Sequence, residues 1–146
     1  MKLFLIAFLC FCPVTSIEWL LDFEKAKWRA QNEHKYILLN FSGSDWCGPC
    51  IQMNKEIFET AMFEEFAKEH LVLLNADFPR SRKHSLSALQ QQKNEQLAES
   101  YNKKGVFPFT ILLNAEGKAI KSWEGFPPLS VEEFTRQIQT ELHGEK

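Results

Sequence analysis

Two cysteines separated by two residues, in the run Trp46-Cys47-Gly48-Pro49-Cys50, constrain this chain more than any other feature of its sequence. At this spacing both thiols fit on a turn that opens into a helix, where the first sulfur gains free backbone N–H groups and the positive end of the helix dipole. That environment stabilises the thiolate, the form that attacks disulfides. We therefore predict a reversible dithiol switch in which Cys47 is the exposed, attacking thiol and Cys50 is the buried, resolving thiol.

A CxxC pair has two other interpretations, half of a zinc site or a structural disulfide. Proline at Pro49 is compatible with a helix start, because its missing N–H would be unbonded there in any case. A zinc site needs two further ligands, and the histidines of the chain do not form a second ligand pair; they are His34, His70, His84 and His143. We therefore expect no metal and no cofactor other than the Cys47–Cys50 pair itself.

The first sixteen residues have the pattern of a secretion signal. A basic start at Lys2 precedes an apolar run over residues 3–11, and a small residue, Ser16, offers a cleavage site. The apolar run is too short to span a bilayer as a helix. We predict a signal peptide over residues 1–16, a single domain over residues 17–146, and export to the periplasm or the medium.

Export would leave Cys47 and Cys50 as the only thiols of the mature chain, because Cys10 and Cys12 lie within the predicted signal. Outside the cytosol a dithiol either uses the oxidising surroundings or opposes them with imported electrons. The net charge of −2 gives no support for a nucleic-acid or anionic-membrane partner. We expect a monomer with one core.

Hydrophobic periodicity predicts an α/β fold. Continuous apolar runs over residues 36–41 and 71–77 are typical of strands buried on both faces. Residues 109–113 and 119–123 fit a hairpin. Helices are expected over residues 19–34 and, after Cys47, over the residues that follow the CxxC motif. Two more should begin at an N-cap at Thr60 and at a capping box at Ser130. A helix over residues 86–101 should turn Leu89, Leu97 and Tyr101 inward. Two strands joined through helices and then a hairpin predict a mixed central sheet with helices on both faces.

These motifs together resemble the thioredoxin superfamily, over nearly the whole chain after the predicted signal. The resemblance is carried by Trp46–Cys50 behind the first strand, by Val106-Phe107-Pro108-Phe109-Thr110 before the hairpin, and by Gly125 after the last strand. It implies a thioredoxin-like fold in which the Phe107–Pro108 peptide is cis and faces the two sulfurs. It also implies supporting roles for Trp46, Gly48 and Pro49.

The chain departs from the thioredoxin pattern at two buried positions. Asn40 stands where thioredoxins carry a buried aspartate that is thought to accept the proton of the second cysteine, and Leu73 stands where they carry a lysine. An asparagine cannot take up a proton at neutral pH. Another base or a water must then activate Cys50. The segment over residues 77–108 is also longer than in a minimal thioredoxin.

The charged and aromatic side chains near the CxxC motif are expected to have structural roles rather than catalytic ones. Arg80, Arg82, Lys83 and His84 form a basic run that we interpret as a solvated loop, with steering of acidic partners as the alternative. Trp46 is expected to pack beside the sulfurs. Asp45 is expected to be exposed, where its charge would tend to raise the pKa of Cys47.

The resemblance implies an exported thiol–disulfide oxidoreductase that reduces disulfide-containing protein substrates. Gly-Pro between the cysteines resembles the reducing end of the range that such proteins cover. A reductase outside the cytosol needs an electron source, so a membrane thiol-interchange partner is implied. The alternatives are a disulfide oxidase or isomerase, and a non-catalytic binding or chaperone module of the same fold.

Overall fold

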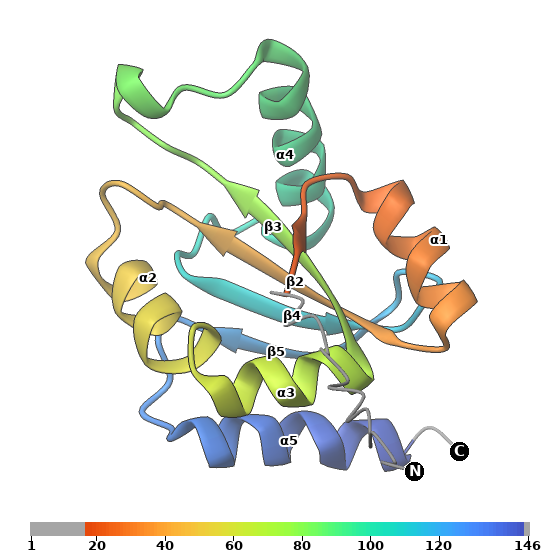
Figure 1. The fold of residues 1–146 in the computed structure, drawn as a ribbon. Helices are drawn as coiled ribbons and strands as arrows, with labels where there is room; N and C mark the ends of the chain where they lie inside the picture. The colour runs from red at the N-terminus through yellow and green to blue at the C-terminus, as the bar shows by residue number, and fades with distance from the viewer. Residues whose placement is uncertain (1–16, 145–146) are drawn as a thin grey trace, which may run out of the picture.

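A five-stranded mixed sheet forms the centre of the computed structural model, which describes residues 17–144 (Figure 1). Its strands run in the order β1 (Trp19–Leu20), β3 (Leu71–Asp77), β2 (Tyr36–Ser42), β4 (Phe109–Leu113) and β5 (Ala119–Glu124). The first three are parallel to one another, and β4 and β5 are antiparallel to their neighbours. This architecture confirms the predicted fold class.

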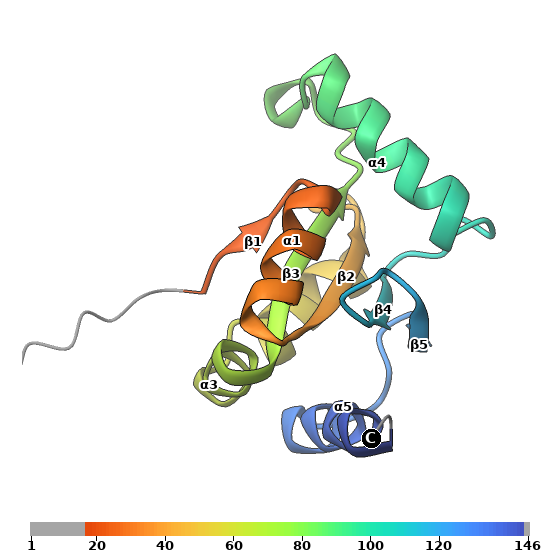
Figure 2. The same cartoon turned by 90° about the vertical axis from the view of Figure 1, so that its right-hand side faces the viewer.

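Helices cover both faces of the sheet (Figure 2). One face packs against α1 (Phe23–Glu33) and α4 (Ala88–Tyr101). The other packs against α2 (Gly48–Met53), α3 (Ala61–His70) and α5 (Val131–Gly144). A π-helical turn, Asn54–Phe58, continues α2 and contributes Ile57 and Phe58 to this second layer.

Alternation along β2 decides which face each of its side chains meets. Ile37, Leu39 and Phe41 are buried against the α1 and α4 layer, whereas Leu38 is buried on the opposite side. Asn40 therefore lies on the α2 side, close to the predicted dithiol. The strand is buried on both faces, as its continuous apolar run predicts.

The predicted helix over residues 19–34 starts too early. Trp19 and Leu20 form β1, which pairs in parallel with Leu73 and Leu74 at the edge of the sheet. The helix begins only after Asp22, whose carboxylate accepts a hydrogen bond from the Lys25 N–H at 2.9 Å. The apolar residues Trp19 and Leu20 are compatible with either a helix or a short strand. They form a strand because the edge of β3 is open and offers them hydrogen-bond partners.

The predicted helix over residues 86–101 also needs correction. It begins at Ala88, capped by the hydroxyl of Ser87, and Leu89 is 63% exposed rather than turned inward. Leu97 is buried as expected. The caps predicted at Thr60 and Ser130 are confirmed, because their hydroxyls accept N–H hydrogen bonds from Phe63 and Glu133 at 3.3 and 3.2 Å.

The predicted signal peptide, with Cys10 and Cys12, lies outside the described residues. Over residues 17–144, none of the helices combines the length and the apolar character that a bilayer crossing needs.

Candidate active site

Cys47 and Cys50 are joined in a disulfide at the start of α2. Cys47 has an extended backbone and is the N-cap of the helix, and its sulfur accepts a hydrogen bond from the Cys50 N–H at 3.3 Å. Pro49 occupies the first turn, as expected of a helix start. The sulfur of Cys47 thus receives the backbone donor that stabilises a thiolate.

The predicted difference in exposure between the two cysteines is absent in the disulfide form. Cys47 is 4% exposed and Cys50 is 5% exposed, so the expectation of an exposed Cys47 is wrong for this state. The bond to Cys50 holds the Cys47 sulfur against the first turn of α2. Gly48 and Pro49, between the cysteines, carry the exposed surface of the motif.

The Phe107–Pro108 peptide bond is cis, as the resemblance implied. The carbonyl of the buried Pro108 accepts a hydrogen bond from the Gly125 N–H at 2.8 Å. Gly125 has a φ of 72°, a conformation that glycine adopts without the steric cost of a side chain. The ring of Phe107 packs edge-on against Trp46 at 5.5 Å between centroids, which brings this segment to the active-site loop.

Trp46 joins the dithiol motif to two distant segments. Its indole N–H donates to the Phe78 carbonyl at 2.7 Å, and the guanidinium of Arg80 lies 3.7 Å from the ring centroid. Gly43 makes room for the indole, because a Cβ on Gly43 would lie 2.4 Å from a ring atom of Trp46. The side chain expected beside the sulfurs is therefore also the anchor for residues 78–80.

Asp45 is not the exposed carboxylate that the sequence suggested. Its side chain is 10% exposed, and its two oxygens accept hydrogen bonds from the N–H groups of Arg80 at 2.9 Å and Ser81 at 2.8 Å. These donors hold the pKa of the Asp45 carboxyl below its usual value, with a smaller contribution from His84. The backbone of the basic run is consequently anchored to the active-site loop, while its side chains are exposed to solvent, as predicted.

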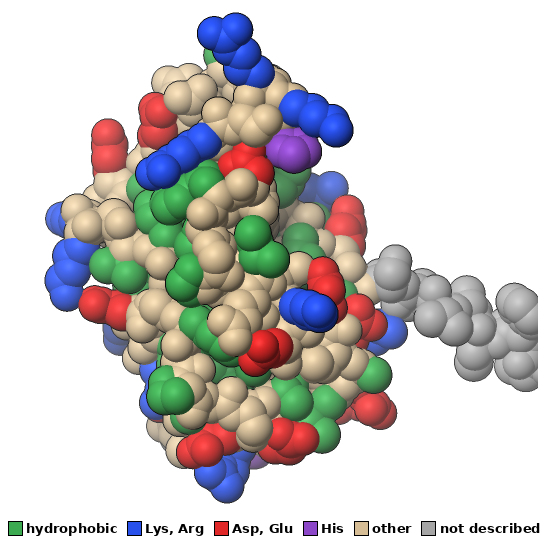
Figure 3. Space-filling model, turned by 90° about the vertical axis from the view of Figure 1, so that its left-hand side faces the viewer, with side chains coloured by type: hydrophobic (Ala, Val, Ile, Leu, Met, Phe, Trp, Pro, Cys, Tyr) green, Lys and Arg blue, Asp and Glu red, His purple; other side chains and the backbone are tan. Residues whose placement is uncertain are grey.

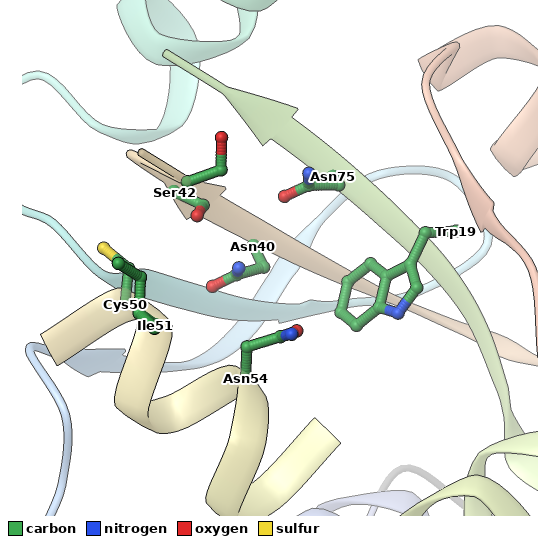
Figure 4. A pocket seen from close by; sticks show the side chains of 8 residues that line it. Trp19, Asn40, Ser42, Cys50, Ile51, Asn54 and Asn75 are labelled. Carbon is green, nitrogen blue, oxygen red and sulfur yellow. The ribbon is translucent and has the colours of Figure 1, made fainter. Parts of the chain in front are cut away.

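A polar pocket of about 350 Å³ opens beside Cys50 (Figure 4). Asn40, which is 8% exposed, lies in its wall and accepts a hydrogen bond from the Thr110 hydroxyl at 3.0 Å. The remaining lining residues come from β1, β2, β3, the active-site loop, α2 and the π-helical turn that follows it: Trp19, Ser42, Ser44, Ile51, Asn54 and Asn75. Amide and hydroxyl groups, rather than a carboxylate, therefore surround the approach to the second cysteine.

Within residues 17–144, His, Cys, Asp and Glu side chains form no group of three or more that could hold a metal ion. Two of the histidines lie beside carboxylates: His84 is 3.4 Å from Asp45, and His70 is 3.6 Å from Glu69.

Comparison with known proteins identifies the family. The family model of the thioredoxin-like domain matches residues 23–140. The disulfide bond reductase DsbH of Chlamydia pneumoniae is 34% identical over 121 residues, which cover 83% of this chain and 70% of that protein. The solved structure of a DsbH oxidoreductase superposes with a TM-score of 0.79 at 31% identity, covering 90% of each chain. The chain belongs to the thioredoxin-like family.

A second relative is the thioredoxin-related protein DsbJ of Chlamydia pneumoniae. It is 31% identical over 105 residues, which make up 72% of this chain but only 29% of DsbJ. Within the thioredoxin-like family the chain thus groups with the DsbH- and DsbJ-like thiol–disulfide oxidoreductases, and Cys47 and Cys50 are its disulfide-forming pair.

Asn75 is the pocket residue that sequence reasoning missed. The register of β2 and β3 sets Asn40 opposite Asn75, whereas Leu73 lies opposite Leu38 in the core. Leu73 is thus not the neighbour of Asn40 across the strands. A signal was present, because both buried strands contain the sequence Leu-Leu-Asn, ending at Asn40 and Asn75. In this chain two amide side chains, Asn40 and Asn75, thus lie opposite each other on neighbouring strands at the position where thioredoxins carry an ionisable base.

Replacing Asn40 with Asp should speed the attack by Cys50 and destabilise the fold. Burial beside Cys50 would raise the pKa of the new carboxyl, letting it take up a proton near neutral pH. The partly desolvated acid should lower the free energy of unfolding by about 1–3 kcal/mol. Single-turnover reduction of a model disulfide across pH, with denaturant unfolding, measures both effects.

Asn75→Asp is the matched control for this variant. Asn75 lines the same pocket but is more exposed than Asn40, so its carboxyl should destabilise the fold less. If Asn40→Asp changed neither the rate nor the stability, Asn40 would not be coupled to Cys50 and the role given to the pocket would be wrong.

The anchor at Asp45 predicts a specific pH dependence. Its pKa in the folded state is below the unfolded value of about 3.9, so its ionised form stabilises the fold above that pH, and this contribution is lost as the pH falls through the folded-state pKa. Asp45→Asn should therefore be less stable than wild type at neutral pH, with the difference shrinking below about pH 4. Thermal unfolding across pH measures it.

Glu132→Gln is the control, because the pKa of the Glu132 carboxyl is also lowered, by hydrogen bonds at the start of α5. Both variants should flatten the acid dependence of stability. Only Asp45→Asn should also accelerate tryptic cleavage after Arg80, Arg82 or Lys83, since only it releases the loop. Equal cleavage rates in both variants would refute the anchoring role.

Proposed function

We propose that this thiol–disulfide oxidoreductase is exported and acts as a reductase of protein disulfides. The observation that carries the proposal is the Cys47 sulfur at the N-cap of α2, where the Cys50 N–H donates to it. The name of its relative, a disulfide bond reductase, supports the reducing direction. Disulfide-containing proteins are the substrates under this proposal.

The reaction starts from the reduced dithiol. The Cys47 thiolate attacks one sulfur of the substrate disulfide, forming a mixed disulfide, and the other substrate sulfur leaves as a thiolate that takes up a proton. Cys50 then loses its proton and attacks the Cys47 sulfur, which closes the Cys47–Cys50 disulfide and releases the second substrate thiol. Two electrons pass from the dithiol to the substrate, and the pair ends in the oxidised form seen in the structure.

Phe107, Pro108 and Trp46 support the attacking sulfur in this scheme. Trp46 and Phe107 pack against each other, and the Pro108 carbonyl is held by Gly125, so these groups form a preorganised wall beside the motif. Gly48 and Pro49 are exposed and leave the surface of the motif open to a protein substrate.

Export and an external electron donor complete the proposal. The signal-like pattern over residues 1–16 supports passage out of the cytosol to the periplasm or medium. There the closed disulfide must be reduced again, and the proposed donor is a membrane thiol-interchange protein.

Turnover is tested by insulin reduction with dithiothreitol as the electron source. Wild type should accelerate the precipitation of the insulin B chain, and Cys50→Ala should not turn over, because the resolving thiol is missing. A wild-type rate equal to that of dithiothreitol alone would favour a binding or chaperone module.

The direction of electron flow is tested by the reduction potential of the Cys47–Cys50 pair. Equilibration with dithiothreitol buffers, followed by alkylation of the free thiols, should give a value nearer about −270 mV than about −120 mV. A potential at the oxidising end would contradict the reductase assignment and favour an oxidase.

A further inference from the structure

The loop over residues 79–85 lies beside the reacting motif and is held there by two backbone contacts within the loop and one at the residue before it. Asp45 accepts the N–H groups of Arg80 and Ser81, and Trp46 donates to the Phe78 carbonyl. A further contact comes from Asp77, whose carboxylate accepts the N–H of Ser44 at 2.9 Å. The loop is thus a fixed part of the surface around Cys47, although more than thirty residues separate the two in sequence.

The side chains of this loop present unneutralised positive charge. Arg80, Arg82 and Lys83 are exposed and form no ion pair with the carboxylates of residues 17–144. Seven cations elsewhere on the described surface have carboxylate partners: Lys27, Arg29, Lys35, Lys93, Lys104, Lys121 and Arg136. Single unpaired lysines also occur, at Lys25, Lys55, Lys68, Lys103 and Lys118, so the loop differs in that its three unpaired cations fall within four residues. The nearby carboxylate of Asp45 is mostly covered, and its oxygens already accept loop N–H groups. In a chain of net charge −2, the loop is a local cationic surface.

Arg80 is preorganised to bind a carboxylate. Its guanidinium stacks over the Trp46 ring at 3.7 Å from the centroid, and the stack fixes the plane of the group. A stacked guanidinium keeps the N–H groups along its edge free for a bidentate contact with a carboxylate. Trp46 directly precedes Cys47, so this donor set lies within a few residues of the sulfur that attacks the substrate.

Charged and apolar surfaces adjoin on the side of the molecule where α2 lies. Figure 3 views the side of the molecule on which α2 lies in Figure 1, and shows Lys and Arg side chains gathered at the top around a histidine, with hydrophobic side chains below them. A protein segment bound on this side of the molecule would therefore meet apolar surface with positive charge next to it.

We propose that the 79–85 loop selects protein disulfides that carry Asp or Glu within a few residues of the cysteine that Cys47 attacks. This inference rests on the proposed reductase function and names the class of substrate. Substrate carboxylates pair with Arg80, Arg82 and Lys83 in the encounter complex. Such exposed pairs act within a Debye length of about 8 Å at physiological salt, so they strengthen binding without changing the chemical step.

The test uses one synthetic peptide with an intramolecular disulfide, made in versions flanked by glutamate, glutamine or lysine. Dithiothreitol recycles the enzyme. At low salt, wild type should reduce the glutamate version with a kcat/KM about tenfold above that of the lysine version, through KM rather than kcat. Added salt should remove the difference.

Two charge-matched double variants locate the effect. Arg82→Gln with Lys83→Gln should weaken the preference for the glutamate peptide, with the remainder due to Arg80, and should leave the glutamine peptide unaffected. Lys68→Gln with Lys118→Gln removes the same charge from exposed, unpaired cations on α3 and in the β4–β5 turn, and should keep the preference.

The outcomes separate this inference from the function on which it rests. Turnover of the glutamine peptide with equal kcat/KM for all three versions would overturn the substrate preference and leave the reductase function standing. Failure to reduce any version would overturn both. Loss of anionic-vesicle binding in the Arg82/Lys83 variant, without peptide discrimination in wild type, would assign the loop to a membrane surface instead.

Discussion

Cys47→Ala should lower the reduction of protein disulfides by more than about a thousandfold, because it removes the attacking sulfur altogether. The Cys47 sulfur is the one that receives the Cys50 N–H at the start of α2, and no other described side chain offers an equivalent nucleophile there. Insulin reduction measures the loss. Circular dichroism should show an intact fold, since the removed sulfur is small and lies at the end of the helix.

Cys50→Ala should fail differently, by accumulating mixed disulfides with substrates. The attacking thiol remains, and the resolving thiol is gone. Non-reducing electrophoresis should show adducts that vanish on reduction and that Cys47→Ala lacks.

In the reduced wild type, limiting iodoacetamide should label Cys47 first, because the sulfur of Cys47 lies at the N-terminus of α2, which stabilises its thiolate. Equal trapping by both variants, or earlier labelling of Cys50, would reverse the assigned order of attack.

Phe134→Ala should lower the free energy of unfolding by about 3–5 kcal/mol, the range for removing a fully buried aromatic ring. Phe134 on α5 is 0% exposed, and its ring centroid lies 4.9 Å from that of Trp123, 6.2 Å from Phe58 and 6.3 Å from Phe63. Phe58 ends the π-helical turn that continues α2. The cavity would therefore loosen the layer that supports the dithiol helix. Denaturant unfolding measures the loss.

Leu89→Ala is the control for this stability prediction. Leu89 is also apolar, but it is 63% exposed on α4, so its truncation should change the free energy of unfolding by only about 0.5 kcal/mol. A loss comparable to that of Phe134→Ala would mean that Leu89 is packed inward, as its spacing in the sequence first suggested.

The sequence by itself determined the elements that depend on local chemistry. The CxxC motif, the two buried strands, the hairpin and the caps at Thr60 and Ser130 are all where the pattern predicted them. Each depends on neighbours a few residues away. A cap needs a hydroxyl that accepts the N–H three positions on, and a strand buried on both faces shows an apolar run without the polar alternation of a half-exposed strand. The dithiol chemistry could be inferred for the same reason.

Only the tertiary structure decided which distant residues meet. Strand register set Asn75, not Leu73, opposite Asn40, and the open edge of β3 turned Trp19 and Leu20 into a strand. The contact of Asp45 with the loop thirty-five residues later covers a carboxylate that looked exposed and fixes Arg80 over Trp46. Neither the spacing nor the composition of the chain encodes such contacts, because they arise when β2 and β3 lie side by side and bring the loops at their carboxyl ends together.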